Sequence, residues 1–308
     1  MPLRFTFRQL EYFVAVGDAG TIVRAAERLN VSSPSISAAI SQLEAEFGAQ
    51  LFVRQHAQGL SLTPGGQCIF NEAKRILDSA GALNDLANDI ADAARGPIAV
   101  GALSTIAPMV SASVRRSFEN AYPEATVSLR EAHQADLLRM LGRAEIDLAI
   151  TYDLEIPKDI AFEPLTALPP YVMIRHDHPL TAAGGVTLED LAAEPMVLLD
   201  LPVSREYFLS TFQNSGFRPT ISERTTSLSV ARSLVANGFG FCLINMRPTT
   251  TTAPDGEELA YLPLAGDHRH LVVGLATKRS EHRSRIVSAF HDHVRDRVEA
   301  GDLPGMGG

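Results

Sequence analysis

The sequence predicts an N-terminal all-α winged helix-turn-helix with a long linker helix, followed by a C-terminal α/β domain of two lobes. Three observations support this fold class: short amphipathic segments at the N-terminus, one apolar stripe sustained from residue 69 to 94, and short apolar runs that alternate with helical segments after residue 97. At about 100–200 residues per domain, 308 residues suffice for two or three domains.

The first three predicted helices follow from apolar spacing and from the residues at their ends. Apolar residues recur at helical spacing in residues 8–17. Thr21 caps a second helix that breaks at Asn30, and Ser33 caps a third helix over residues 34–47. Two helices joined by a three-residue turn form the helix-turn-helix layout. The short apolar runs at 51–53 and 60–62, with Gly59 between them, then predict a small hairpin.

A long helix with an apolar seam comes next. Its seam residues follow one another in alternating steps of four and three: Ile69, Ala73, Ile76, Ala80, Leu83, Ala87, Ile90 and Ala94. A heptad seam of this length predicts a coiled coil, with dimer contacts at Ile76, Ala80, Leu83, Ala87 and Ile90. The alternative is a single amphipathic helix packed on its own domain. Arg95-Gly96-Pro97 ends the helix as a hinge.

The rest of the chain has α/β patterning. The expected strands are the apolar runs at 98–103, 126–130, 147–151, 171–174, 196–199, 241–244 and 271–276. Helical patterns lie between them at 107–121, 134–142, 204–215 and 227–237, with a final helix near 281–298. This alternation predicts a largely parallel sheet, and about 210 residues predict two lobes. The expected divisions are 1–66 for the winged helix-turn-helix, 67–95 for the linker helix and 96–308 for the α/β domain. Within that domain, lobe I takes about 98–168 and 272–298, and lobe II takes about 169–271.

Composition and charge limit the function. Apolar residues make up 45% of the chain and charged residues 20%, which excludes a disordered protein. The net charge of −9 argues against a protein that coats nucleic acid nonspecifically. Residues 1–66 contain five Arg, no Lys and five acidic residues, so this segment is neutral and the remainder carries the whole negative charge.

The sequence predicts a cytoplasmic protein that does not enter a membrane. It contains no run of about 18 apolar residues, and its N-terminus lacks the apolar core of a signal peptide. Its two cysteines, Cys68 and Cys242, cannot build a disulfide framework. Cys68 lies beside the apolar seam and Cys242 in an apolar run, so both are expected to be small core residues rather than a redox-sensing pair.

The third helix has a face suited to a DNA groove. Opposite its apolar stripe it carries small or neutral side chains, namely Pro34, Ser35, Ala38, Ser41 and Gln42. Ser and Gln side chains can hydrogen-bond base edges in a major groove. Arg54 and His56 on the hairpin would touch phosphate or the minor groove. The alternative is an ordinary three-helix domain with a serine-rich surface.

The chain resembles the LysR-type transcriptional regulators. The resemblance rests on AAERLNVSSPSISAAISQLEAEFGAQLFVR at 25–54 and LSLTPGGQ at 60–67, and the order of elements extends it over the whole chain. It implies a periplasmic-binding-protein-like (type 2) C-terminal domain. It places base-reading positions on Ser33, Pro34, Ser35, Ala38 and Ser41, and phosphate contacts on Ser37 and Arg54. The family usually has Gln at the position of Ser33 and a longer polar residue at that of Ala38, so the operator sequence cannot be transferred from a relative.

The effector site of the C-terminal domain is expected at the ends of its strands. Ser104 and Thr105 follow the first strand and precede a helix, where hydroxyl and N–H groups can bind an anion; the alternative is a plain helix cap. The resemblance implies further contacts at His133, Gln134, Asp200, Leu201, Pro202 and Ser227. The expected effector is a small organic acid or another polar metabolite.

Other functions find little support in the sequence. It has no nucleophile elbow, phosphate loop or zinc-protease motif, so we expect no enzyme and no cofactor. The pairs His176/His178 and His291/His293 lack an identifiable third ligand, so we expect no metal, and the second pair is expected to be solvated.

The resemblance implies a bacterial regulator that binds promoter operator DNA as a dimer or tetramer and acts with RNA polymerase. The rival hypothesis is a solute-binding or catalytic α/β protein whose N-terminal module only dimerises.

Overall fold

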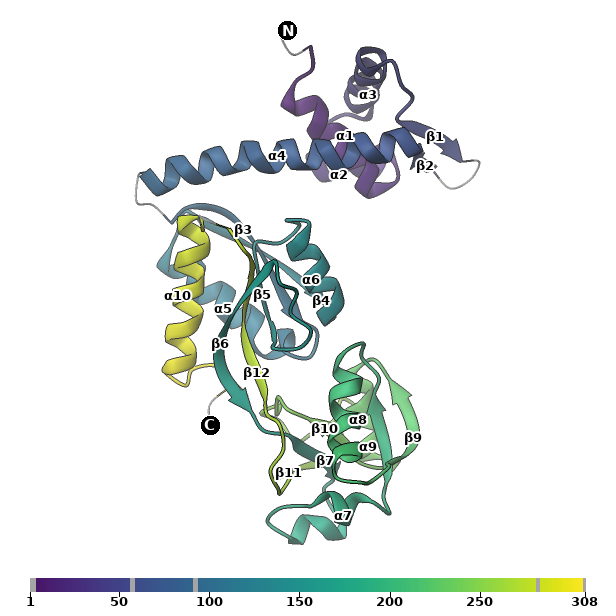
Figure 1. Ribbon diagram of the computed structural model, residues 1–308, viewed down its shortest axis with the longest axis vertical. Coiled ribbons are helices and arrows are strands. Elements are labelled where there is room, and N and C mark those ends of the chain that lie inside the picture. Colours follow the sequence, from purple (N-terminus) through teal and green to yellow (C-terminus); the bar gives the residue numbers. More distant parts are fainter. Residues whose placement is uncertain (1–3, 56–58, 91–93, 281–282, 307–308) are drawn as a thin grey trace. The chain divides into compact units, whose positions relative to one another are not determined.

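The computed structural model describes residues 4–55, 59–90, 94–280 and 283–306, with the backbone alone at residues 54, 55, 78, 82 and 84–90. The chain divides into two compact units, Met1–Ile90 and Ala91–Gly308 (Figure 1). Each unit has a hydrophobic core of its own. We call them the N-terminal and the C-terminal unit.

The N-terminal unit begins with three helices, α1 (Phe7–Ala19), α2 (Ile22–Leu29) and α3 (Ser33–Phe47). Thr21 caps α2 as predicted, and Asn30 ends it in the left-handed conformation with φ 58°. The predicted cap of α3 is wrong by one residue. Ser32 is the cap, because its backbone is extended and its hydroxyl accepts a hydrogen bond from Ser35 N at 3.3 Å.

A two-stranded wing follows α3. It consists of β1 (Phe52–Gln55) and β2 (Gly59–Leu62), which pair in antiparallel register. A side-chain oxygen of Glu44 on α3 accepts from Leu51 N at 2.8 Å, directly before β1. Leu60 N donates to Gly20 O at 2.8 Å, at the end of α1. These bonds fix the wing to the helices at both of its strands.

The long helix α4 (Pro64–Ile90) packs on its own unit over its first half. Phe70 is buried, and its ring meets that of Phe13 edge-on at 6.0 Å between centroids. Seam residue Ala73 is also buried in this core, so this part of the seam follows the alternative of a helix packed on its own domain. Farther along, the side chain of Leu83 is 73% exposed. The side chains of the seam residues Ala87 and Ile90 lie outside the part of the chain that the structure describes.

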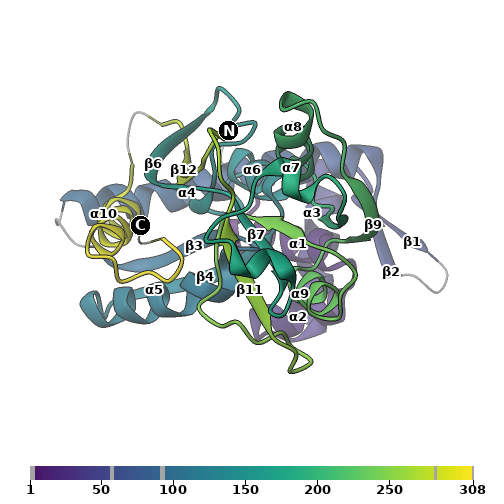
Figure 2. The same ribbon diagram turned by 90° about the horizontal axis from the view of Figure 1, so that it is seen from below.

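The first lobe of the C-terminal unit contains a five-stranded sheet. Its strands are β3 (Gly96–Leu103), β4 (Ala125–Ala132), β5 (Leu148–Tyr152), β6 (Ile160–Leu168) and β12 (Leu271–Lys278), in the order β4-β3-β5-β12-β6. Strand β3 is parallel to both neighbours, whereas β12 is antiparallel to both of its own. Helices α5 (Ala107–Ala121) and α10 (Arg285–Glu299) lie side by side, with Phe118 against Phe290, and α6 (Gln134–Gly142) covers the other face (Figures 1 and 2).

The second lobe has the strands β7 (Tyr171–Arg175), β8 (Pro195–Leu199), β9 (Thr220–Thr225), β10 (Cys242–Ile244) and β11 (Leu259–Pro263). Its helices are the 3₁₀ turn η1 (Pro179–Ala182), α7 (Leu188–Leu191), α8 (Ser204–Asn214) and α9 (Leu228–Ala236). β7 pairs antiparallel with β10 and β11, β8 pairs parallel with β9, and a bridge from Met196 to Phe241 joins the two groups. Gly240 is needed at this junction, because its φ is 135° and a Cβ would lie 2.0 Å from Pro195 O.

The fold class predicted from the sequence is confirmed, with corrections of detail. Every predicted strand and helix of the C-terminal unit has a counterpart, but β6, β9, β11, α7 and η1 were not anticipated. The sheets are not largely parallel: the five-stranded sheet is mixed, and the β10-β7-β11 sheet is antiparallel. Two residue environments also differ from expectation: Cys68 is exposed, and His291 is buried with its Nε2 2.8 Å from a Glu163 carboxylate oxygen. Within the described part of the chain, no helix is long and apolar enough to cross a membrane.

Candidate functional site

The outer face of α3 carries most of the side chains that the sequence assigned to DNA reading. Pro34, Ser35, Ser37, Ala38 and Ser41 are exposed, and Ser33 is half-exposed. The opposite face is buried through Ile36, Ala39, Ile40 and Leu43, which holds the helix on its unit. The exposed face is therefore rigidly supported and lined with hydroxyl groups and small apolar groups. The side chain of Arg54 and the whole of His56, the two predicted wing contacts, lie outside the described residues.

A glutamine on α1 that the sequence analysis did not single out extends this face. Gln9 Nε2 donates to Gln42 Oε1 at 2.8 Å; Gln42 is exposed and Gln9 is half-exposed. The Gln9 oxygen accepts from Thr6 N at 2.8 Å in the capping box of α1, so its position is fixed. The Gln42 oxygen is thereby directed toward α1, and its NH₂ group is the end left to donate to another molecule.

A second candidate site lies in the C-terminal unit, where the carboxyl ends of strands from both lobes meet. In each lobe, two parallel strands mark the point where the chain reverses its winding direction, and ligands of open α/β sheets bind at such points. The lobe I strands there are β3 and β5, and the lobe II strands are β8 and β10.

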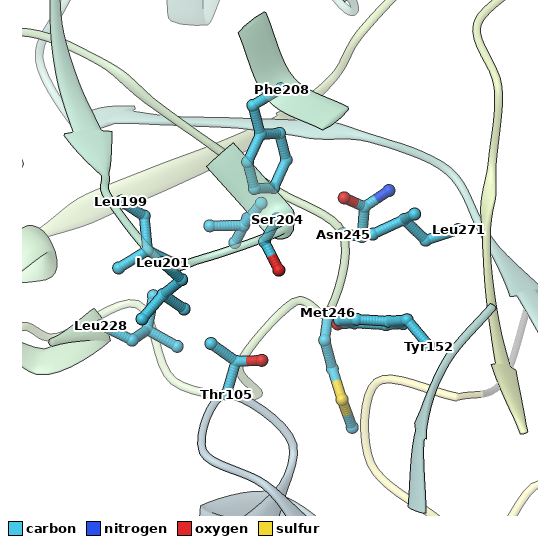
Figure 3. A pocket seen from close by; sticks show the side chains of 11 residues that line it. Thr105, Tyr152, Leu199, Leu201, Ser204, Phe208, Leu228, Asn245, Met246 and Leu271 are labelled. Carbon is cyan, nitrogen blue, oxygen red and sulfur yellow. The ribbon is translucent and has the colours of Figure 1, made fainter. Parts of the chain in front are cut away.

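A narrow pocket opens between these strand ends (Figure 3). Its lining comprises Thr105, Tyr152, Leu199, Leu201, Ser204, Phe208, Leu228, Ile244, Asn245, Met246 and Leu271. Most of these side chains are apolar, and Thr105, Tyr152, Ser204 and Asn245 supply the polar groups. Among the described residues that line the pocket, none carries a charge.

Two polar groups on the lobe I side are paired with each other. The hydroxyl of Tyr152 is fully buried, and burial raises its pKa, while a hydrogen bond with Thr105 opposes the shift in part. Tyr152 is therefore a neutral donor or acceptor at physiological pH. On the lobe II side, Ser204 is the first residue of α8 and is 5% exposed. Figure 3 shows its hydroxyl directed into the pocket.

The residue before Ser204 has a strained backbone. Val203 has φ 72° and ψ −53°, and Ser204 N donates to Pro202 O at 2.9 Å, which closes a three-residue γ-turn. This turn is rare for residues other than glycine, and such conformations cost on the order of 1–3 kcal/mol. They cluster at ligand sites in proteins, and here the turn places Ser204 on the pocket wall.

Both units match one protein family. Residues 7–67 match the bacterial regulatory helix-turn-helix protein of the lysR family, and residues 91–299 match the LysR substrate binding domain. The solved structure of HinK, a LysR family transcriptional regulator from Pseudomonas aeruginosa, is 31% identical, with a TM-score of 0.64 over 95% of this chain and 98% of HinK. This chain belongs to the LysR family.

Two further relatives give the same result over more than nine-tenths of the chain. The transcriptional regulator BudR from Raoultella terrigena is 28% identical over 288 residues, which cover 92% of this chain and 98% of BudR. A full-length OxyR variant from Pseudomonas aeruginosa is 26% identical, with a TM-score of 0.70 over 95% of this chain and 98% of that one. The chain is therefore a DNA-binding transcriptional regulator with an effector-binding domain, and the rival hypothesis of a solute-binding or catalytic protein is set aside.

The structure brings only some of the predicted effector residues to the pocket of this LysR domain. Thr105 and Leu201 line it. Gln134 does not: it is buried in lobe I, where its Nε2 donates to Tyr152 O at 2.9 Å and Leu154 O at 2.8 Å, and its oxygen accepts from the Thr151 hydroxyl. Its amide is thus used to hold α6 against the end of β5.

The remaining predicted residues lie at the ends of strands and helices near the pocket but do not line it. The Ser104 hydroxyl lies 3.2 Å from His133 Nδ1, so these two residues pair with each other. Ser227 caps α9 by accepting from Val230 N at 3.4 Å. Pro202 is exposed.

Asp200 belongs to an ion cluster that the sequence analysis missed. One carboxylate oxygen accepts from Arg205 Nη1 at 2.9 Å, and the other accepts from Arg224 Nη1 at 3.1 Å. The hydrogen bond from Arg205 is the largest contribution to the lowered pKa of Asp200. Two guanidinium groups thus neutralise the charge of this carboxylate.

Sequence reasoning also missed Tyr152, Ser204 and Asn245 in the pocket lining. A signal for them was present, because Tyr152 and Asn245 directly follow predicted strands, and Ser204 opens a predicted helix. The rule that ligands bind at strand ends selects Tyr152 and Asn245 but not Ser204.

Proposed function

We propose that α3 reads operator DNA in the major groove through Ser33, Pro34, Ser35, Ala38 and Ser41. Their exposure on one face of a well-supported helix is the observation that carries this assignment. Ser37 and, on the wing, Arg54 and His56 would contact phosphate or the minor groove. The DNA-binding part is then residues 1–66, joined by a linker helix at 67–95 to an effector domain at 96–308.

We infer that the regulator binds its operator as a dimer or a dimer of dimers. Residues 1–66 are electrically neutral, so one DNA-binding domain is expected to bind phosphate weakly. Two linked domains bind more tightly, because the second one acts at a high effective concentration once the first is bound. Leu83 is the exposed seam residue of α4 that a second copy would cover. The contacts at Ile76, Ala80, Ala87 and Ile90 belong to the same proposed surface.

The location of the protein and its remaining partners are inferred from the activity of LysR regulators in transcription. A transcription regulator acts on chromosomal DNA, so the protein would reside in the bacterial cytoplasm and cooperate with RNA polymerase at the promoter. We assign it no catalytic activity and no cofactor. A small-molecule effector in the cleft, for which the sequence alone predicts an organic acid or another polar metabolite, would shift the balance between two arrangements of the protein, provided that it binds one of them better.

DNA binding to the protein's own upstream region tests this proposal. In fluorescence anisotropy titrations over a series of salt concentrations, Arg54→Ala should weaken binding to every sequence and reduce the salt slope by about one ion, since it removes one phosphate contact. Ser35→Ala should instead change the preference among half-site variants. Arg115→Ala on α5, which removes an exposed arginine of the effector domain, serves as the control. Parent-like affinity and salt slope for Arg54→Ala would refute the wing assignment.

A further inference from the structure

The pocket contains a buried hydrogen-bond acceptor that lacks a donor. Asn245 is 3% exposed, and its Nδ2 donates to Leu168 O at 3.0 Å and to the Tyr207 hydroxyl oxygen at 3.1 Å. Its Oδ1 is buried and has no partner among the described residues. Because Leu168 O can only accept, the amide nitrogen must face it, which fixes the orientation of the amide. Figure 3 shows the oxygen turned toward the side of the pocket where Ser204 and Phe208 lie.

Asn245 connects the pocket to both chain segments that cross between the lobes. Leu168 ends β6, where the chain leaves lobe I, and Arg269 precedes β12, where the chain returns to it. The Tyr207 hydroxyl donates to Arg269 O at 2.6 Å while it accepts from Asn245. The N–H and O–H donors of Asn245 and Tyr207 therefore bond to carbonyls of the crossing segments or to each other. The acceptor that is left unpaired is Asn245 Oδ1, at the pocket. Hydrogen bonds in such chains strengthen one another.

The surroundings of this acceptor disfavour an anion. Helix N-termini attract anions, but at two of those near the pocket one amide is already engaged within the protein: Ser204 N bonds to Pro202 O at 2.9 Å, and Val230 N bonds to Ser227 Oγ at 3.4 Å. No described lining residue offers a positive charge. The free-energy cost of burying a carboxylate without a cation far exceeds the stabilisation from a helix dipole. The Asn245 oxygen would also repel the carboxylate.

We propose that the effector is a small neutral molecule with an apolar body and one O–H or N–H group that donates to Asn245 Oδ1. This proposal rests on the proposed role of the cleft as the effector site. The enclosed space is about 20 Å³, which is room for about one water molecule. A larger molecule must therefore part the lobes or displace the Met246 side chain. Because such a molecule fits only when the pocket is widened in one of these ways, its binding selects the widened arrangement, and its hydrogen bond to Asn245 connects it to both crossing segments.

Three matched probes test this chemistry on the full-length protein at pH 7. Phenol is neutral and carries a donor, anisole has the same ring without the donor, and benzoate carries a negative charge. In calorimetric titrations, phenol should bind about tenfold more tightly than anisole, the size of one hydrogen bond to an otherwise unpaired buried acceptor. Benzoate should bind more weakly than phenol. Equal affinities for phenol and anisole, tighter binding of benzoate, or no binding of any of the three would overturn the proposal.

Variants locate the site. Ser204→Val should abolish phenol binding, because the larger side chain fills the narrow pocket, whereas Ser215→Val at the exposed end of α8 should not. Asn245→Leu should make the affinities for phenol and anisole equal. If Asn245→Leu fails to fold, the comparison of probes on the parent protein and the Ser204→Val variant still decide the question. Phenol binding that survives Ser204→Val would place the ligand elsewhere and refute the proposal.

Binding of the same protein samples to the upstream DNA, measured with and without each probe, distinguishes failure of this proposal from failure of the proposed function. A protein that binds its DNA and responds to benzoate rather than phenol remains an effector-controlled regulator, and only the neutral-ligand proposal fails. A protein that does not bind DNA under any of these conditions refutes the proposed function itself.

Discussion

The carboxylate of Asp200 accepts a hydrogen bond from Arg205 at 2.9 Å, and a second guanidinium, that of Arg224, bonds to its other oxygen at 3.1 Å. Arg205 lies in the first turn of α8 and Arg224 lies on β9, so the cluster joins a helix to the edge strand of lobe II. Its geometry makes Asp200 a structural carboxylate rather than a group poised to meet a ligand.

The first prediction concerns acid stability. Because the folded-state pKa of Asp200 is lowered, the stability that it contributes is present above its unfolded pKa of about 3.9 and is lost as pH falls through the folded value. Asp200→Asn should therefore lower Tm at pH 7, and the difference from the parent protein should shrink as the pH is taken toward 3. Thermal melts at a series of pH values measure this. Asp267→Asn, at an exposed position, is the control, and a difference that stays constant down to pH 3 would contradict the prediction.

The second prediction concerns Gln134. Gln134→Ala would leave the carbonyls of Tyr152 and Leu154 without their shared donor inside lobe I. Each unsatisfied buried group costs about 1–3 kcal/mol, so we expect a loss of at least about 2 kcal/mol in the unfolding free energy of the C-terminal unit. Urea titrations followed by circular dichroism check this, with Gln213→Ala at an exposed position of α8 as the control. An unchanged midpoint for Gln134→Ala would show that water replaces the amide.

Much of the fold could be predicted from the sequence, because apolar periodicity and end residues determine its main elements. Two of the omitted strands, β6 and β9, lacked that signal. β9 has the sequence Thr-Ile-Ser-Glu-Arg-Thr and is largely exposed at the edge of its sheet, and β6 contains Pro164. Edge strands do not need apolar alternation, and they tolerate proline. The antiparallel direction of β12 depends on a return crossing between the lobes, which local patterns do not encode.

The site was predictable at the level of chain position but not of side-chain direction. Ser104, Thr105 and Gln134 all lie at strand ends, as expected for a ligand site. Whether such a side chain enters the pocket or the lobe depends on its packing. Thr105 enters the pocket, whereas Gln134 turns into lobe I because two carbonyls there need a donor. The missing donor at Asn245 likewise depends on contacts with residues distant in sequence.

The third prediction concerns assembly through α4. Leu83 is 73% exposed in a single chain and lies on the heptad seam, where a second copy of the helix would cover it. Leu83→Asp would place a charge in that contact and should yield monomers that bind operator DNA at least tenfold more weakly. Gly81→Asp, exposed on the same helix but off the seam, adds the same charge and should remain dimeric. Light scattering after size exclusion measures this, and an intact Leu83→Asp dimer would show that the seam lies elsewhere.

The fourth prediction concerns the two thiols. Burial raises the pKa of Cys242 to about 12, so almost none of it is thiolate at pH 8, whereas Cys68 is exposed on α4. Thiolate is the reactive form. A colorimetric disulfide reagent should therefore react rapidly with one thiol per native chain and with two after unfolding in guanidinium. Cys68→Ser should remove the rapid reaction, and Cys242→Ser should leave it unchanged. Because Cys242 cannot react while the domain is folded, brief peroxide treatment of the Cys68→Ser variant should leave its DNA affinity unchanged; a loss of affinity would show that Cys242 becomes accessible and can sense oxidants.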